Sequence, residues 1–279
     1  MAHVLVLQHP YLADTDLSAL HHTGLLLPDT IHGAVLRIAV PENYIVPAAV
    51  AAELNRQRID YAVLPDLAFA DLGLIVSDMD STLITIECVD EIAACAGLKA
   101  QVAEITEQSM RGELDFEQSL RQRVALLRGL PESALQAVYD NILQLSPGAE
   151  YLLAECKQHG VKFMLVSGGF TFFTERLKQQ LGLDFTYANI LEVENGKLTG
   201  SLNGRIIDAQ AKADLLVQYR QQLGLQAHQV LAMGDGANDI PMLQEAGFGV
   251  AYRAKPKAQQ HADLCINYNG LEAIRGWFR

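Results

Sequence analysis

Acidic residues gather directly behind two apolar runs of the chain, and their chemistry is the first clue to what the protein does. The runs cover residues 72–76 and 230–233, and both have the length and composition of buried strands. The polar residues behind them are Asp78, Asp80, Asp235, Asn238 and Asp239. Carboxylates gathered at the ends of buried strands are costly unless a cation neutralises them. We therefore predict a divalent metal site beside an aspartate that attacks a substrate, and oxygen-only ligands favour Mg²⁺.

Asp78 and Asp80 also allow a simpler interpretation, a solvated turn in which they cap backbone N–H groups. The second acidic cluster makes that turn the weaker hypothesis. If the first strand continues through Asp80, the alternation of side chains sends both carboxylates to one side. If it ends at Ser77, backbone carbonyls there become free to bind a cation.

A second strand, expected at residues 160–166, ends at Ser167, Gly168 and Gly169 before a helix. Glycines let the backbone approach a ligand closely, and N–H groups at a helix start favour anions. Lys212 lies near the start of another predicted helix, where the helix dipole disfavours a cation. These residues predict an anion site, with an ordinary strand-to-helix turn and a surface lysine as the alternatives.

Two charged residues, Glu87 and Arg123, belong to a long helical stretch. Arg123 lies at the edge of an apolar stripe with helical spacing, and a charge beside a buried face suggests a partner under a lid. The stripe consists of Phe116, Leu120, Val124 and Leu127. The alternatives are an arginine that reaches solvent and, for Glu87, an acid that pairs with the dipole at a helix start.

The elements that must position these residues alternate along the chain. Residues 1–71 predict a small α/β unit, whose function the sequence does not indicate. From residue 72 onward buried strands alternate with helices, which indicates a parallel sheet with crossovers, and the all-helical stretch 89–145 inside it is a natural lid. Further strands are expected at 160–166, 230–233, 248–251 and 264–266, helices at 172–181 and 211–223, and a hairpin at 190–200.

Composition excludes some classes of protein. The 279 residues carry a net charge of −12, which argues against a nucleic-acid surface because such a surface is basic. The start of the chain lacks the pattern of a signal peptide, and no apolar stretch is long enough to span a membrane. We expect a soluble cytoplasmic protein without a membrane or nucleic-acid partner. The four cysteines lack metal-binding or redox spacing. The oligomeric state stays open, with a homodimer as one possibility.

Taken together, these residues resemble the haloacid dehalogenase (HAD) superfamily of phosphotransferases. Its signature is an Asp-x-Asp-x-Thr motif, here residues 78–82, then Ser167, Lys212 and a Gly-Asp-Gly-x-Asn-Asp motif, here residues 234–239. Within this superfamily, the chain resembles the phosphoserine phosphatase family most. That closer resemblance rests on Glu87 and on the segments 111–124 and 166–170. The resemblance covers residue 72 to the C-terminus.

The resemblance implies an α/β fold: a doubly wound parallel sheet core with a helical cap inserted after its first strand. The core domain would cover residues 72–279 and the cap about residues 88–145. A small N-terminal α/β domain, residues 1–71, would precede the core. This domain could be a variant of the regulatory ACT-like extensions of bacterial relatives.

The resemblance also implies roles for single residues. Asp78 would be the nucleophile that forms an aspartyl-phosphate, and Asp80 the acid that protonates the leaving oxygen and then the base that activates water. Asp78, the backbone carbonyl of Asp80, and Asp235 would bind Mg²⁺, with Asp239 behind them. The substrate-binding residues would be Glu87 for an ammonium group, Arg123 for a carboxylate, and Ser167, Gly168, Lys212 and Asn238 for a phosphoryl group.

The implied activity is hydrolysis of O-phosphoserine, a small-molecule substrate, to serine and phosphate, the last step of serine biosynthesis. Three alternatives stay open: transfer of the phosphoryl group to another hydroxyl acceptor, hydrolysis of another small phosphorylated metabolite, and a non-catalytic sensor of serine or a phosphorylated ligand. Regulation by serine through residues 1–71 is a separate hypothesis.

Overall fold

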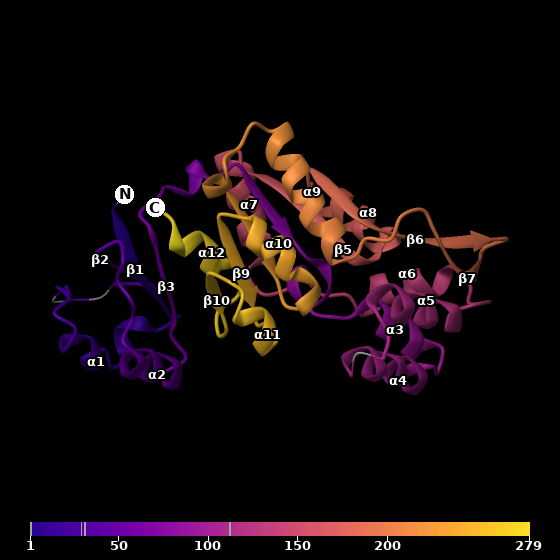
Figure 1. The fold of residues 1–279 in the computed structure, drawn as a ribbon, viewed down its shortest axis with the longest axis horizontal. Coiled ribbons are helices and arrows are strands. Elements are labelled where there is room, and N and C mark those ends of the chain that lie inside the picture. Colours follow the sequence, from indigo (N-terminus) through magenta and orange to yellow (C-terminus); the bar gives the residue numbers. More distant parts are fainter. Residues whose placement is uncertain (1, 29, 31, 112) are drawn as a thin grey trace.

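The computed structural model describes residues 2–28, 30, 32–111 and 113–279 and contains two sheets (Figure 1). The strands are β1 (His3–Gln8), β2 (Val35–Val40), β3 (Asp60–Pro65), β4 (Leu74–Ser77), β5 (Lys162–Phe170), β6 (Phe185–Glu194), β7 (Lys197–Asn203), β8 (Val230–Gly234), β9 (Phe248–Tyr252) and β10 (Leu264–Ile266). The helices are α1 (Ser18–His21), α2 (Ala48–Arg56), α3 (Cys88–Cys95), α4 (Lys99–Met110), α5 (Phe116–Leu126), α6 (Ser133–Asn141), α7 (Ala149–His159), α8 (Thr171–Leu181), α9 (Ala209–Gln222), α10 (Ile240–Glu245), α11 (Pro256–Gln259) and α12 (Glu272–Trp277).

The larger sheet has the strand order β10-β9-β8-β4-β5-β6-β7, and every pair in it is parallel except β6 with β7. Both faces of β4 are buried. Leu74 and Val76 share a cluster with Leu216 of α9, whereas Ile75 belongs to the cluster that contains Leu152 of α7. Helices therefore cover both faces of the sheet, which confirms the predicted doubly wound α/β core.

The smaller sheet has β1 between β2 and β3, both antiparallel to it. Alternate side chains of β1 face two different cores. Leu5 and Leu7 pack in a cluster of residues 5–59, and Val4 and Val6 join the main core. The small sheet thus lies between α1 and α2 on one side and the C-terminal part of the chain on the other (Figure 1).

Helices α3, α4, α5 and α6 form the predicted helical cap between β4 and β5, beside one end of the sheet (Figure 1). The two connections to the core run side by side, because Thr85 N–H donates to the Gln144 carbonyl at 2.9 Å and Ser146 N–H to the Leu83 carbonyl at 2.9 Å. The β6–β7 hairpin also contacts the cap through Gly129. The sequence-predicted turn of this hairpin, Asn195-Gly196, has φ of 50° and 73°.

One strand boundary differs from the prediction. We expected the second core strand to end at residue 166, but β5 continues to Phe170. It re-forms its pairing with β6 after an irregularity, so that Phe170 lies opposite Asn189. Ser167, Gly168 and Gly169 are therefore a bulge within the strand and not a loop after it. Among the described residues, no helix has the length and apolar character needed to span a membrane.

Candidate active site

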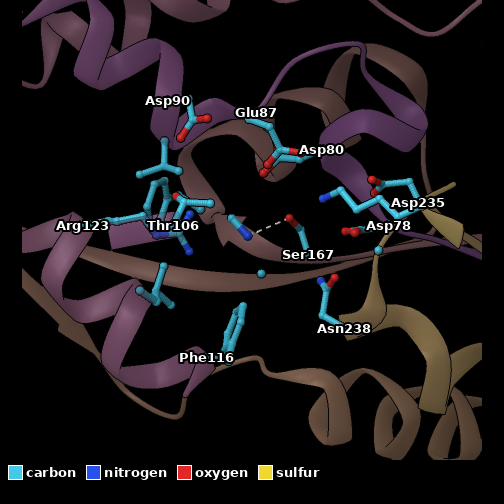
Figure 2. A pocket seen from close by; sticks show the side chains of 17 residues that line it. Asp78, Asp80, Glu87, Asp90, Thr106, Phe116, Arg123, Ser167, Asp235 and Asn238 are labelled. Atoms are coloured by element: carbon cyan, nitrogen blue, oxygen red, sulfur yellow. Dashed lines mark hydrogen bonds between the residues drawn. The ribbon is translucent and has the colours of Figure 1, made fainter. Parts of the chain in front are cut away.

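Asp78 and Asp80 leave the sheet through a tight turn. β4 ends at Ser77, so the predicted alternation of a continuing strand does not apply. Asp78 N–H still donates to the Met233 carbonyl at 3.0 Å, which keeps this residue beside β8. The chain then turns through Ser81, whose φ is +54°. Both carboxylates reach the same cavity because of this turn (Figure 2).

A buried lysine joins the two acidic segments. Lys212, in the first turn of α9, is fully buried, and its Nζ lies 2.8 Å from Asp78 Oδ1 and 2.7 Å from Asp239 Oδ1. Carboxylate oxygens of Asp78, Asp235 and Asp239 lie within 4.8 Å of one another. One buried ammonium group cannot neutralise three carboxylates. The cluster therefore keeps an excess of negative charge.

The pKa values reflect this excess. Burial raises the pKa of Asp78 well above its ordinary range, and repulsion by Asp239 adds to the effect. Burial and the same neighbour raise the pKa of Asp235 to about 6. Burial alone would lower the pKa of Lys212, but its two carboxylate partners outweigh burial and raise it, so this lysine stays charged.

The bulge in β5 forms the floor of the cavity. Gly169 N–H donates to Ser167 Oγ at 2.8 Å, the bond drawn in Figure 2. A Cβ atom on Gly168 would lie 3.0 Å from Phe116, and one on Gly169 would lie 3.0 Å from Asp80 Oδ2. A side chain at either position would therefore have to displace Phe116 or Asp80, whereas glycine fits without a shift.

Glu87 faces the cavity from the cap side (Figure 2). It occupies the N-terminal capping position of α3, yet its side chain makes no capping hydrogen bond there and accepts instead from Ser81 Oγ at 2.7 Å. Glu87 thus lies at the helix start, as the dipole alternative expects, but its carboxylate is directed to Ser81 and the cavity. Burial and the charge of Glu87 raise the pKa of Asp80 to about 7.

Arg123 extends into the cavity across from Glu87, from the last turn of α5 (Figure 2). Its Nε donates to the Ser119 carbonyl at 3.4 Å. Among the described residues, no carboxylate oxygen lies within 4 Å of its guanidinium nitrogens, so Arg123 forms no ion pair with them. The side chain is half-buried and does not extend fully into solvent. Its terminal nitrogens are available for an anion.

Eight of the nine site residues expected from the sequence line one cavity of about 300 Å³. They are Asp78, Asp80, Glu87, Arg123, Ser167, Gly168, Asp235 and Asn238. Lys212 is the exception. It is buried and bound to Asp78 and Asp239, so the surface alternative is wrong, while its contact with a phosphoryl group stays a prediction.

Sequence reasoning missed three polar residues of the cavity lining: Asp90, Thr106 and Lys255. Asp90 follows Glu87 by three residues, a helical spacing that could have indicated a shared face. Lys255 follows the end of β9, and its N–H donates to the Asp235 carbonyl at 2.9 Å. The rule that strand ends carry the site would have found it. Thr106 lies on α4 and gives no signal in the sequence.

Known proteins are similar to this chain in sequence and in fold. A family model for haloacid dehalogenase-like hydrolases matches residues 72–247. A phosphoserine phosphatase from Polaromonas is 52% identical over 227 residues, which cover 80% of this chain and 96% of the relative.

Two solved structures are similar to that of this protein. A HAD family hydrolase from Salmonella enterica serovar Typhi is 33% identical, with a TM-score of 0.90 over 99% of this chain and 98% of its own. A phospho-aspartyl intermediate analogue of phosphoserine phosphatase is 40% identical, with a TM-score of 0.70 over 75% of this chain and 99% of its own. The family match and the identity to these relatives agree with the motifs and the fold, and the chain belongs to the haloacid dehalogenase-like hydrolases.

Proposed function

We propose that the protein is a Mg²⁺-dependent phosphoserine phosphatase that hydrolyses O-phosphoserine to serine and phosphate. One observation carries the proposal: a single small cavity joins the acidic cluster at the sheet to Glu87 and Arg123 on the cap. The first end suits a phosphoryl group with a metal ion, and the second suits the ammonium and carboxylate groups of an amino acid. The relatives that bear this activity in their names support the assignment.

The acidic cluster fits Mg²⁺, because its donor atoms are all oxygens and its negative charge is larger than the positive charge of Lys212. We assign the ion to Asp78, Asp235 and the backbone carbonyl of Asp80. Asp239 has a carboxylate oxygen close enough to take part, but Lys212 and Gly236 N–H, at 2.9 Å, already occupy its oxygens. When bound, Mg²⁺ would offset the repulsion between a carboxylate nucleophile and a phosphate dianion.

The first half-reaction begins with Asp78. One of its carboxylate oxygens attacks phosphorus, a P–O bond forms, and the bond to the seryl oxygen breaks. Protonated Asp80 gives its proton to the leaving oxygen, so serine departs as a neutral alcohol. Ser167, the Gly168 N–H and Asn238 lie along the cavity where they can donate to the phosphoryl oxygens. Lys212 holds Asp78 in position from below.

The second half-reaction releases phosphate. Asp80, now a carboxylate, takes a proton from a water molecule, and the resulting oxygen attacks the phosphorus of aspartyl-phosphate. The bond between phosphorus and the Asp78 oxygen breaks. Inorganic phosphate leaves, Asp78 is again a carboxylate, and Asp80 is again protonated for the next cycle.

Release of phosphate from a panel of small phosphomonoesters, with and without Mg²⁺, tests the proposal, with Asp78→Asn as the blank. We expect O-phosphoserine to be the best substrate and borohydride to trap the phosphoenzyme at Asp78. Full activity in Asp78→Asn contradicts the mechanism. Product analysis with added alcohols separates hydrolysis from phosphoryl transfer, because a transferase would yield a new phosphate ester.

Two matched variants on α5 test how the substrate is recognised. Arg123→Ala should raise the KM for O-phosphoserine about 100-fold, because a charge-assisted contact to the carboxylate is lost. Arg121 lies on the same helix but is half-exposed and pairs with Glu117 at 2.7 Å. Arg121→Ala should leave the KM unchanged. An unchanged KM in Arg123→Ala would point to a phosphatase of another metabolite.

The division into residues 1–71 and 72–279, with a cap at about 88–145, belongs to the same proposal. The cytoplasmic location expected of a biosynthetic enzyme also belongs to it. Limited proteolysis tests the division, since a preferred cleavage site near residue 71 would mark the boundary between the two parts. Cell fractionation tests the location.

A further inference from the structure

The bulge in β5 leaves part of the backbone without its strand partner. Val166 pairs with Tyr187 and Phe170 with Asn189, so β5 uses two more residues than β6 between these pairs. The peptide bond between Gly168 and Gly169 lies in this excess segment. A peptide between two glycines can turn over easily, because no Cβ atom restricts either residue. Because the backbone ladder does not hold this peptide, a side-chain contact is needed to fix its orientation.

Asn189 supplies that hold. Its side chain is 1% exposed, and its Nδ2 donates to the Gly168 carbonyl at 2.8 Å. The carbonyl and the N–H of one trans peptide point in opposite directions. Fixing the Gly168 carbonyl on the Asn189 side therefore directs the Gly169 N–H away from it. That N–H donates to Ser167 Oγ at 2.8 Å.

The Ser167 hydroxyl then has a defined role. Its oxygen already accepts from Gly169, so its own hydrogen remains to be donated to another acceptor. Ser167 lines the cavity where the phosphoryl group is proposed to bind. If the peptide turned over, the Gly168 carbonyl oxygen would replace the Gly169 N–H beside Ser167 Oγ and would accept the serine hydrogen that the phosphoryl group needs.

The other end of the Asn189 amide reaches the segment before α9. Asn189 Oδ1 accepts from Ile207 N–H at 2.8 Å. The next residue, Asp208, caps α9 by accepting from Ala211 N–H at 2.8 Å, and α9 carries Lys212. One buried amide thus connects the bulge of β5 to α9, the helix whose Lys212 binds the nucleophile Asp78.

We propose that Asn189 is a positioning residue, whose side-chain amide locks the peptide between Gly168 and Gly169 so that Ser167 donates to the phosphoryl group. The inference rests on the proposed phosphatase activity. Asn189 is not among the described residues that line the cavity, and it acts through the bulge. Asn189→Asp is the sharpest variant, because a carboxylate still accepts from Ile207 N–H but presents an oxygen to the Gly168 carbonyl.

We expect Asn189→Asp to lower kcat about 100-fold, close to the loss of one donor to an oxyanion. Calorimetric titration with inorganic phosphate, in the presence of Mg²⁺, should give a Kd about 10-fold weaker than that of the wild type. Asn203→Asp adds the same charge at an exposed position of β7 and should change neither value. A kcat and a phosphate Kd within twofold of the wild type in Asn189→Asp overturn the proposal.

A double-mutant cycle with Ser167→Ala separates positioning from general damage. If Asn189 acts through Ser167, Asn189→Asp should lower kcat less than threefold once the hydroxyl is gone, whereas independent effects multiply. Multiplying effects overturn the proposal. If Asn189→Asp does not fold by urea titration, Asn189→Ser replaces it in the same cycle. The phosphate titration needs no phosphoserine, so a wrong substrate assignment would leave the result on Asn189 interpretable.

Discussion

Two buried carboxylate sites, one in the cavity and one between the two sheets, differ in how their charge is balanced. Asp78 in the cavity is 5% exposed and shares a single buried ammonium group with Asp239. Asp60 of β3 is 2% exposed and lies against the loop after β10. It accepts from the N–H of Asn267 at 2.7 Å, from the N–H of Tyr268 at 3.1 Å, and from the N–H and Nδ2 of Asn269, both at 2.8 Å.

Burial alone therefore does not identify a functional carboxylate. Asp60 is surrounded by fixed donors, so its charge is satisfied and nothing further is needed to hold it. The cluster in the cavity has three carboxylates around one buried ammonium group, which makes it a site for a cation. The Asp60 contacts also join the small sheet firmly to the core, together with the bond from Gln8 Nε2 to the Ala273 carbonyl at 2.8 Å.

Replacing the nucleophile should have the largest effect and should separate the two sites by activity. Asp78→Asn removes the attacking oxygen, and we expect kcat to fall about 10⁴-fold or more. Without Mg²⁺ the variant should be at least as stable as the wild type, because it removes one of three crowded charges. Phosphate release and urea unfolding measure the two quantities. A strongly destabilised Asp78→Asn would mean that the cluster is balanced like Asp60.

Removing the buried cation should have the next largest effect. Lys212→Met leaves Asp78 and Asp239 without their ammonium partner, and we expect the free energy of unfolding without Mg²⁺ to fall by about 3–5 kcal/mol. Lys162 is the matched control, since its Nζ also lies 2.7 Å from a carboxylate, that of Asp184, but is half-exposed. Lys162→Met should lower the stability by about 1 kcal/mol or less. Equal losses would show that burial does not matter here.

Much of the main sheet could be predicted from the sequence, because its strands are short apolar runs and local turn residues end them. Asn195 and Gly196 adopt the positive φ values of the expected hairpin turn, and Gly182 ends α8 with a φ of +68°. The bulge of β5 could not be predicted. It depends on the pairing of Phe170 with Asn189, a contact between strands that no local pattern records.

The site residues divide in the same way. Residues within motifs, such as Asp78 and Asp235, could be predicted because strand ends bring them together. The burial of Lys212 could not, since a lysine at a helix start looks the same whether it faces solvent or two carboxylates. Asp60 gave no signal either, because its partners lie more than 200 residues away in the chain.

Removing the charge of Asp60 should have a smaller effect, and this effect should be on stability only. Asp60→Asn keeps the size of the side chain but turns an N–H₂ group toward backbone donors, so we expect a loss of about 2–3 kcal/mol in the free energy of unfolding. The kcat per folded molecule should stay within twofold of the wild type. Asp66→Asn is the control, because the ion pair of Asp66 with Arg37 at 2.7 Å is partly exposed. A large fall in kcat for Asp60→Asn would join the two sites functionally.

The smallest effect should come from adding Mg²⁺, and it tests the charge argument most directly. An ion that binds only the folded protein at ten times its Kd should raise the free energy of unfolding by about 1.4 kcal/mol. Asp235→Asn removes one oxygen ligand from the cluster and should abolish this gain. Asp60→Asn should keep the gain in full, because fixed donors already surround the Asp60 carboxylate and no cation is expected to bind there. Urea unfolding at fixed Mg²⁺ concentrations, with Ca²⁺ and Na⁺ for comparison, measures the gain. An equal gain in both variants would mean that the ion binds elsewhere, and the excess of charge beside Asp78 would then need another explanation.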